Sequence, residues 1–150
     1  MLEETYYLNF QGYWVEPYKH SIPSFAGIYN VYACTSNKLT KTVNLNRLIY
    51  IGEADDVCQR ILGHNKWPDW RRNLSFGEEI CFSAANIVPL GARQRAEAAL
   101  IFEHKPPANI EYIASFPFHK TTVISAGCSL FIKPAFTVKT DAISKTSLFG

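Results

Sequence analysis

The chain has 150 residues, of which 47% are hydrophobic and 14% aromatic, enough to bury a sizeable core in one domain. Its formal net charge is only +2, which excludes a globally basic surface, so any affinity for phosphate must come from local clusters of cations. No stretch reaches the roughly 18 apolar residues that a membrane span needs.

The cysteines and the N-terminus bear on compartment and metal use. The 4 cysteines stand far apart, without a Cys-x-x-Cys pair or a histidine at zinc-finger spacing, so we expect no zinc site. Glu3 and Glu4 stand where a signal peptide carries positive charge. The sequence therefore predicts a cytoplasmic protein with reduced thiols and no membrane association.

The first third of the chain predicts three strands. Thr5–Phe10 is aromatic and β-prone, and the two-proline segment Tyr13–Pro23 after it predicts an ordered loop. Gly27–Cys34 and Arg47–Gly52 are short β-branched and aromatic runs. We expect the polar segment Thr35–Asn46 to join these two strands.

Two helices and another strand are predicted next. Asp55-Asp56 offers N-cap chemistry for a helix that ends near Gly63-His64. After a loop at Trp67–Arg72, alternation predicts a strand over Glu79–Ile87. Gly91–His104 is rich in Ala, Arg and Glu and predicts a helix that Pro106 and Pro107 end.

The last part predicts a hairpin over Thr121–Val138 around Ala126-Gly127, then a frayed tail over 142–150. The element order β-β-α-β-α, with added strands at both ends, predicts an α/β fold in which helices sandwich a small mixed β-sheet. We expect residues 1–150 to form one domain, with 1–26 and 110–141 as flanking strands and loops.

Two triplets contain candidate functional residues: Gly27-Ile28-Tyr29 and Tyr50-Ile51-Gly52. Singly, each tyrosine is typical of a core residue. Together, on adjacent strands, they would bring two phenols to one sheet edge, and a helix would bring Arg60 to the same edge. The order continues through Arg60, His64, Glu97 and Asn109. On these residues, the segment 27–109 resembles the GIY-YIG nuclease superfamily, and the flanks lie outside the resemblance.

The resemblance implies an endonuclease that hydrolyses phosphodiester bonds with one Mg²⁺ or Mn²⁺ ion bound by Glu97. It implies that Arg60 stabilises charge on the phosphate, for which its planar fork of donors is suited. Tyr29 is then the general base or the group that orients the attacking water, and Tyr50 is its hydrogen-bonding neighbour. Without the motif, Glu97 would be a solvated helix carboxylate and Arg60 a surface partner of Asp56.

Three more residues have alternative roles. His64, one turn after Arg60, could relay a proton from Tyr29, hold a phosphate oxygen, or simply favour a helix C-terminus. Asn109 is expected to order the loop beneath Glu97 through its amide and not to touch substrate. Glu53 departs from the family pattern, because an extra carboxylate there would either add a metal ligand or oppose the phosphate.

Cations beside aromatic residues follow the arginine helix and indicate a groove for nucleic acid. They are Lys66, Trp67, Trp70, Arg71 and Arg72. The alternative is that both tryptophans belong to the core. Arg93 stands near the start of the Glu97 helix, where the dipole disfavours positive charge, so a bound phosphate would explain it.

Stacking residues combined with a weak net charge favour single-stranded or branched DNA over duplex DNA. Two alternatives stay open. One is a restriction-like or defence endonuclease that cuts duplex DNA as a homodimer, with Thr5–Phe10 and Thr121–Val138 as the interface. The other is a non-catalytic nucleic-acid-binding module. RNA also stays open as the substrate, and the C-terminal hairpin either extends the groove or completes the sheet.

Overall fold

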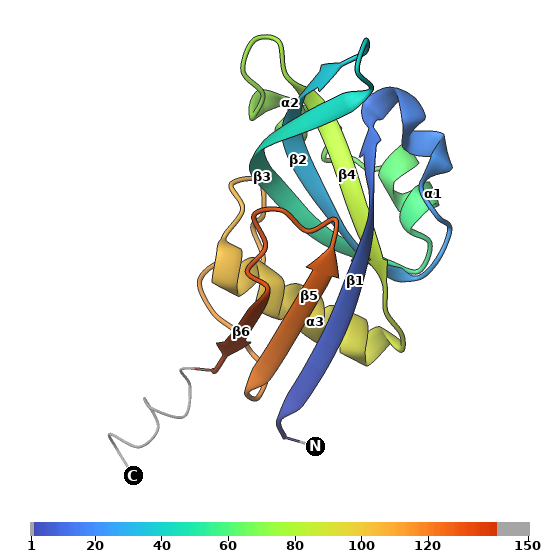
Figure 1. Ribbon diagram of the computed structural model, residues 1–150. Helices are drawn as coiled ribbons and strands as arrows, with labels where there is room; N and C mark the ends of the chain where they lie inside the picture. Colours follow the sequence, from blue (N-terminus) through green and yellow to red (C-terminus); the bar gives the residue numbers. More distant parts are fainter. Residues whose placement is uncertain (1, 141–150) are drawn as a thin grey trace.

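The computed structural model describes residues 2–140, which form a mixed α/β fold around one 6-stranded sheet with the order β3-β2-β4-β1-β5-β6 (Figure 1). The strands are β1 (Glu4–Val15), β2 (Gly27–Asn37), β3 (Thr42–Ala54), β4 (Glu79–Asn86), β5 (Thr121–Gly127) and β6 (Ala135–Val138). The helices are the 3-10 helix η1 (Glu16–Ser21) and the α-helices α1 (Val57–Leu62), α2 (Trp67–Arg72) and α3 (Leu90–His104). Neighbouring strands are antiparallel except β1 and β5, which are parallel.

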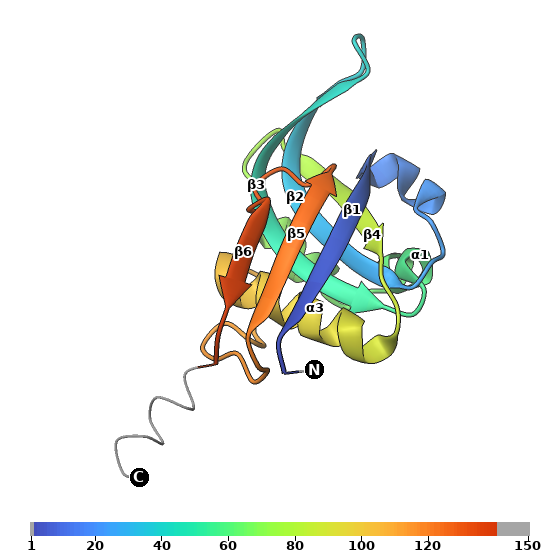
Figure 2. The same cartoon turned by 60° about the horizontal axis from the view of Figure 1, so that its bottom comes forward.

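Helices pack on both faces of the sheet, as the sequence predicts. α3 crosses the strands near one end of the sheet (Figures 1 and 2), where Leu100 packs in one core cluster with Ile28 and Ile51. α1 and α2 pack on the other face, in a second cluster that contains Tyr29 and Trp70. Ile28 and Tyr29 enter different clusters because successive strand residues point to opposite faces.

β1 is longer and more central than expected. It continues through a register shift after Gly12 and pairs Trp14 with Phe82 and Val15 with Cys81 of β4, so the prediction that a loop starts at Tyr13 is wrong. A bulge of this kind lets a strand continue past a residue that breaks the ladder. β1 also lies between β4 and β5, and is therefore not an outer strand available for edge pairing in a dimer.

The polar segment 35–46 is part of two paired strands and not a separate connection. β2 and β3 stay paired, through two register shifts, up to the pair Asn37 and Thr42, and Figure 2 shows this hairpin projecting beyond the rest of the sheet. Polar side chains support the pairing, since the Asn46 side-chain amide donates to the Thr35 hydroxyl over 3.1 Å. Cross-strand hydrogen bonds of this kind compensate for the low β-propensity of asparagine.

The predicted helices are confirmed. Asp56 caps α1 by accepting a hydrogen bond from the backbone N–H of Gln59 over 3.0 Å. α3 spans Leu90–His104 and ends at Lys105, which has left-handed backbone angles. The loop expected at Trp67–Arg72 is wrong, because these residues form α2. A proline in the first turn is compatible with a helix, and this one buries the two tryptophans one turn apart.

The C-terminal hairpin completes the sheet. β5 and β6 are antiparallel, as predicted, but 128–134 connects them, so a tight turn at Ala126-Gly127 is wrong. Gly127 has φ +83°, and a Cβ there would lie 2.3 Å from the carbonyl oxygen of Phe10, so β5 ends in close contact with β1. The predicted tail 142–150 lies outside the described residues. Within 2–140, no helix combines the length and apolarity that crossing a membrane requires.

Candidate active site

Tyr29 and Tyr50 lie side by side on one face of the sheet. The register pairs Tyr29 with Gly52 and Val31 with Tyr50, so the two tyrosines are diagonal neighbours on adjacent strands. Their ring centroids are 6.3 Å apart. Tyr29 is buried and Tyr50 is half-buried. The structure therefore brings both phenols to the edge strand β3, as the two triplets predict.

Gly52 provides the space for the Tyr29 ring. A Cβ on Gly52 would lie 2.3 Å from the Tyr29 hydroxyl oxygen and 2.3 Å from its Cζ, too close for any side chain. The phenol of Tyr29 thus crosses the backbone of the edge strand and reaches the boundary of the sheet. A glycine at this position is required by the close approach of the ring.

Arg60 approaches the phenols from α1. It is exposed at the surface and lines the same pocket as the two phenols. Burial nevertheless raises the pKa of Tyr29 well above its usual value of 10, with a further increase from Tyr50, and the positive charge of Arg60 only partly opposes this. Tyr29 is therefore a neutral phenol at physiological pH.

Glu97 joins this group from α3, which packs on the opposite face of the sheet. It lines a polar pocket of about 240 Å³ at the β3 edge. The pocket is lined by Tyr29, Tyr50, Gly52, Glu53, Arg60, Gln94, Glu97, Glu111 and Tyr112. Four of the five predicted catalytic residues therefore meet in one pocket although they come from four different elements, β2, β3, α1 and α3.

The carboxyl group of Glu97 is poorly solvated. Burial raises its pKa to about 8, and the carboxylates of Glu53 and Glu111 add to the increase. A backbone hydrogen bond from Glu53 and the charge of Arg93 oppose it. An added cation would relieve the unfavourable energy of an ionised Glu97.

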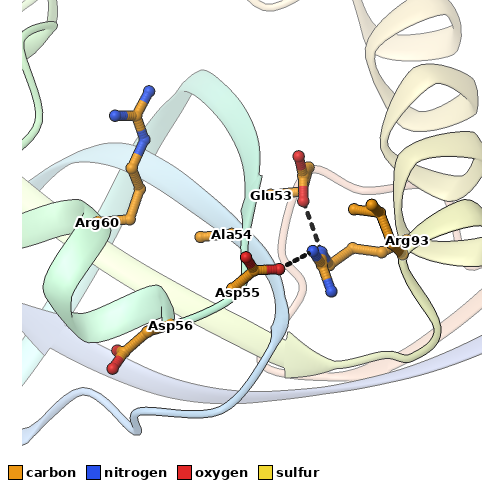
Figure 3. A pocket seen from close by; sticks show the side chains of 7 residues that line it. Glu53, Ala54, Asp55, Asp56, Arg60 and Arg93 are labelled. Carbon is orange, nitrogen blue, oxygen red and sulfur yellow. Dashed lines mark hydrogen bonds and ion pairs between the residues drawn. The ribbon is translucent and has the colours of Figure 1, made fainter.

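The guanidinium of Arg93 is not free to bind phosphate, because it is paired with carboxylates of the same chain. It is 3% exposed, and its guanidinium is bound between Glu53 and Asp55 (Figure 3). The Nε–Oε1 distance to Glu53 is 2.5 Å. The interpretation of Arg93 as a nucleic-acid ligand is therefore wrong for this conformation, because two carboxylates already neutralise it. Figure 3 also shows Arg60 across a second pocket of about 370 Å³ from Arg93.

His64 packs behind the tyrosine pair and does not line the pocket. Its ring centroid is 6.2 Å from that of Tyr29 and 5.7 Å from that of Tyr50. It is 5% exposed, and its Nδ1 accepts a hydrogen bond from the backbone N–H of Lys66, which places the proton on Nε2. Burial and the charges of Arg60 and Lys66 lower its pKa to about 4. His64 is therefore a neutral packing neighbour of the phenols.

The predicted stacking groove on α2 is wrong. Trp70 is 0% exposed and Trp67 is 9% exposed, because both belong to the core on this face. The Trp67 indole donates to the carbonyl oxygen of Ile61 over 2.8 Å. Bases cannot stack on either ring in this structure.

The cations of α2 are largely paired within the chain. Lys66 and Arg72 both form ion pairs with Asp69, and Arg71 pairs with Glu16 over 2.6 Å. Arg71 also lies 4.8 Å from the ring centroid of Trp67. Two carboxylates therefore offset most of the charge of these three cations, which weakens their attraction for phosphate.

Asn109 fixes the loop after α3 to the edge strand. Its amide oxygen accepts from the backbone N–H of Ile51 over 3.0 Å, and its amide nitrogen donates to the carbonyl oxygen of Ile51 over 2.9 Å. Asn109 is 7% exposed, and its side-chain amide pairs with the backbone N–H and C=O of Ile51 as the backbone of an adjacent strand would. It orders the loop and does not line the pocket, as its amide chemistry predicts.

Three pocket residues are missing from the sequence-based set: Gln94, Glu111 and Tyr112. Gln94 could have been found, because it stands one helical turn before Glu97. Tyr112 has a positive φ of 63°, and the sequence carries no signal for it or for Glu111. Their place in the pocket follows from the path of the loop that Asn109 holds.

The residues that could hold a cation are few. In the described part of the chain, no group of three or more His, Cys, Asp or Glu side chains has a geometry that could hold a metal ion. A hard cation such as Mg²⁺ keeps several waters and binds through one or two carboxylates. The oxygen donors of Glu97 and Glu53 in a polar pocket fit that mode of binding.

Comparisons with protein-family models, with curated proteins and with solved structures each found no match.

Proposed function

We propose that the chain is a divalent-metal-dependent endonuclease that hydrolyses phosphodiester bonds in DNA, as its resemblance to the GIY-YIG nuclease superfamily implies. The observation that carries the proposal is the shared pocket of Tyr29, Tyr50, Arg60 and Glu97. Hydrolysis of a phosphodiester needs an oriented water and neutralisation of charge on the phosphate. A neutral phenol, an exposed guanidinium and a carboxylate at one sheet edge are suited to these tasks.

Each residue then has a distinct task. Arg60 binds phosphate oxygens through its fork of N–H donors. Because Tyr29 is a neutral phenol, we assign it to orienting the attacking water through its hydroxyl and not to removing a proton. Tyr50 packs beside Tyr29 and limits its motion. Glu97, helped by Glu53, would hold one Mg²⁺ or Mn²⁺ ion, which supplies positive charge for the phosphate when bound.

The burial of the tryptophans removes the main support for a preference for single strands. A preference for single strands requires exposed rings on which bases stack, and Trp67 and Trp70 are both in the core. Among residues 2–140, Arg60 is the only cation that lines the 240 Å³ pocket, alongside three carboxylates, Glu53, Glu97 and Glu111. This charge balance suits one diester phosphate better than a multiply charged phosphate monoester.

The test is cleavage of labelled single-stranded and duplex DNA with Mg²⁺, Mn²⁺ or a chelator at matched salt. We expect metal-dependent cutting by the wild type and a loss of at least about a hundredfold in Glu97→Gln. Glu103→Gln is the matched control, because Glu103 is on the same helix but pairs with Lys133 away from the pocket. DNA binding without cutting by the wild type would instead support the non-catalytic module.

A further inference from the structure

The β2–β3 hairpin carries an unusual surface at its tip. We define the hairpin arm as residues 35–46, which project from the sheet in Figure 2. Leu39 is 95% exposed at the end of the arm. Lys38 and Lys41 flank it, both exposed. Within residues 2–140 the Leu39 side chain is almost fully exposed, so it is free to contact another molecule.

The charge of the arm is uncompensated. Segment 35–46 contains no aspartate or glutamate. Among residues 2–140, neither Lys38 nor Lys41 has an ion-pair partner, in contrast to Lys66, Arg71 and Arg72 on α2. The arm therefore presents two lysines without an ion-pair partner, whereas Lys66, Arg71 and Arg72 share the carboxylates of Asp69 and Glu16.

The arm is also ordered. At the tip, the Asn37 side-chain oxygen accepts from the backbone N–H groups of Leu39 and Thr40 over 3.0 and 3.2 Å. At the base, the Asn46 amide donates to Glu78 over 2.8 Å, and Arg47 forms an ion pair with the same carboxylate. A braced hairpin loses less conformational entropy on binding than a free loop.

We propose that the hairpin arm inserts its tip into the major groove of duplex DNA, so that Lys38 and Lys41 contact phosphates and Leu39 contacts base edges. A two-stranded β-ribbon fits the major groove of B-form DNA, which is about 12 Å wide. The deep, narrow major groove of A-form RNA does not admit one. The shape of the arm thus selects DNA, and specifically its double-stranded form.

The arm and the pocket can engage one duplex. The arm and the pocket both include residues of β3. The part of this strand from Thr42, in the arm, to Gly52, in the pocket, would span about 33 Å if fully extended. One turn of B-form DNA is roughly 34–36 Å long. A duplex with its scissile phosphate at the pocket would therefore present a groove near the tip one turn away. In this respect the inference rests on the proposed function, because it places the same DNA at the pocket.

Binding without cleavage tests the arm. Fluorescence anisotropy in EDTA would compare a duplex DNA of about three helical turns, its separated single strand and the corresponding duplex RNA over a range of salt concentrations. The variants are Lys38→Gln/Lys41→Gln and Leu39→Ser. The control is Lys120→Gln/Lys139→Gln, which removes the same charge beside the start of β5 and the end of β6, at the opposite end of the sheet from the arm (Figure 1).

We expect the arm double variant to weaken duplex DNA binding at least about tenfold at 0.1 M salt and to reduce the slope of log affinity against log salt by about 2. Leu39→Ser should weaken duplex DNA binding with the salt slope unchanged, and the control pair should bind as the wild type does. The inference is overturned if the control pair loses as much affinity, if the arm variants bind duplex DNA normally, or if single-stranded DNA or duplex RNA shows the same loss.

These outcomes are separate from those for hydrolysis. Arm-dependent duplex binding by a protein that cuts no DNA would support the arm and contradict the nuclease. Metal-dependent cutting that Glu97→Gln abolishes, together with arm variants that bind duplex DNA normally, would support the nuclease and contradict the arm.

Discussion

The phenol of Tyr29 lies directly over the α-carbon of Gly52, so a Cβ at that position would be 2.3 Å from the hydroxyl oxygen. The two residues face each other in the antiparallel register of β2 and β3. One belongs to each of the two triplets, which explains physically why a tyrosine in one triplet requires a glycine in the other. The pocket exists because the ring can cross the edge strand at this glycine.

Gly52→Ala should displace Tyr29 and destabilise the protein. The added methyl group overlaps the buried ring, and overpacking of this kind costs about 1–3 kcal/mol. Urea denaturation would measure the loss in the free energy of unfolding. Gly91→Ala is the matched control, because a Cβ there has no neighbouring atom within 4 Å and alanine favours the helix. Equal stability of the two variants would contradict the role assigned to Gly52.

Asn109→Asp should loosen the loop that closes the pocket. The carboxylate can still accept from the Ile51 N–H, but it cannot donate to the Ile51 carbonyl oxygen, which is then unsatisfied in a buried site. We expect a loss of about 1–3 kcal/mol in the free energy of unfolding. Asn86→Asp is the control, since it loses a similar bond to the carbonyl oxygen of Ala26 at an exposed position. A larger loss in the control would argue against this role.

The sequence predicts the pocket better than its surroundings. Tyr29, Tyr50 and Arg60 come together because their spacing fixes them on adjacent strands and on the helix that follows. The burial of Trp70 was not predictable in the same way, because it depends on how α2 packs against the sheet. The pairing of Arg93 with Glu53 joins residues 40 positions apart, and local patterns carry no information on such contacts.

Glu97 should make the free energy of unfolding depend on pH. Its pKa is about 8 in the folded state and near its usual value of 4.5 when unfolded, so the folded state holds the extra proton between these values. The contribution of Glu97 to stability is therefore complete below about pH 4.5 and is lost as pH rises through 8. Glu97→Gln should remove this dependence and be more stable than the wild type at pH 8 in urea denaturation. A wild-type protein that gained stability over this range relative to Glu97→Gln would contradict the assignment.

Cation binding should release a proton. A carboxylate must be ionised to bind Mn²⁺, and at pH 7 Glu97 is mostly protonated in the cation-free protein. Calorimetric titration in buffers of different ionisation enthalpy should show about one proton released per ion. Glu53→Gln should reduce this number, because the Glu53 carboxylate contributes to the raised pKa of Glu97. Heats that do not depend on the buffer would contradict binding by a Glu97 that is protonated before the cation arrives.

His64 should make the protein sensitive to acid without contributing a proton to catalysis. Its pKa is about 4 in the folded state, against its usual 6.5, so the unfolded state takes up a proton first as the pH falls. The stability that neutral His64 provides is present above pH 6.5 and is lost as pH falls through about 4. His64→Gln, whose side-chain oxygen can still accept from the Lys66 N–H, should show a weaker loss of stability over this range in urea denaturation.

The same substitution separates packing from proton transfer. If His64 only packs against the phenols, DNA cleavage should have no ionisation near pH 6.5 that disappears in His64→Gln. In the urea denaturation experiment above, the matched control is His20→Gln, because His20 in η1 is exposed. An ionisation near pH 6.5 that His64→Gln alone removes would show that His64 titrates in the working enzyme, and would restore the proton relay from Tyr29 as its role.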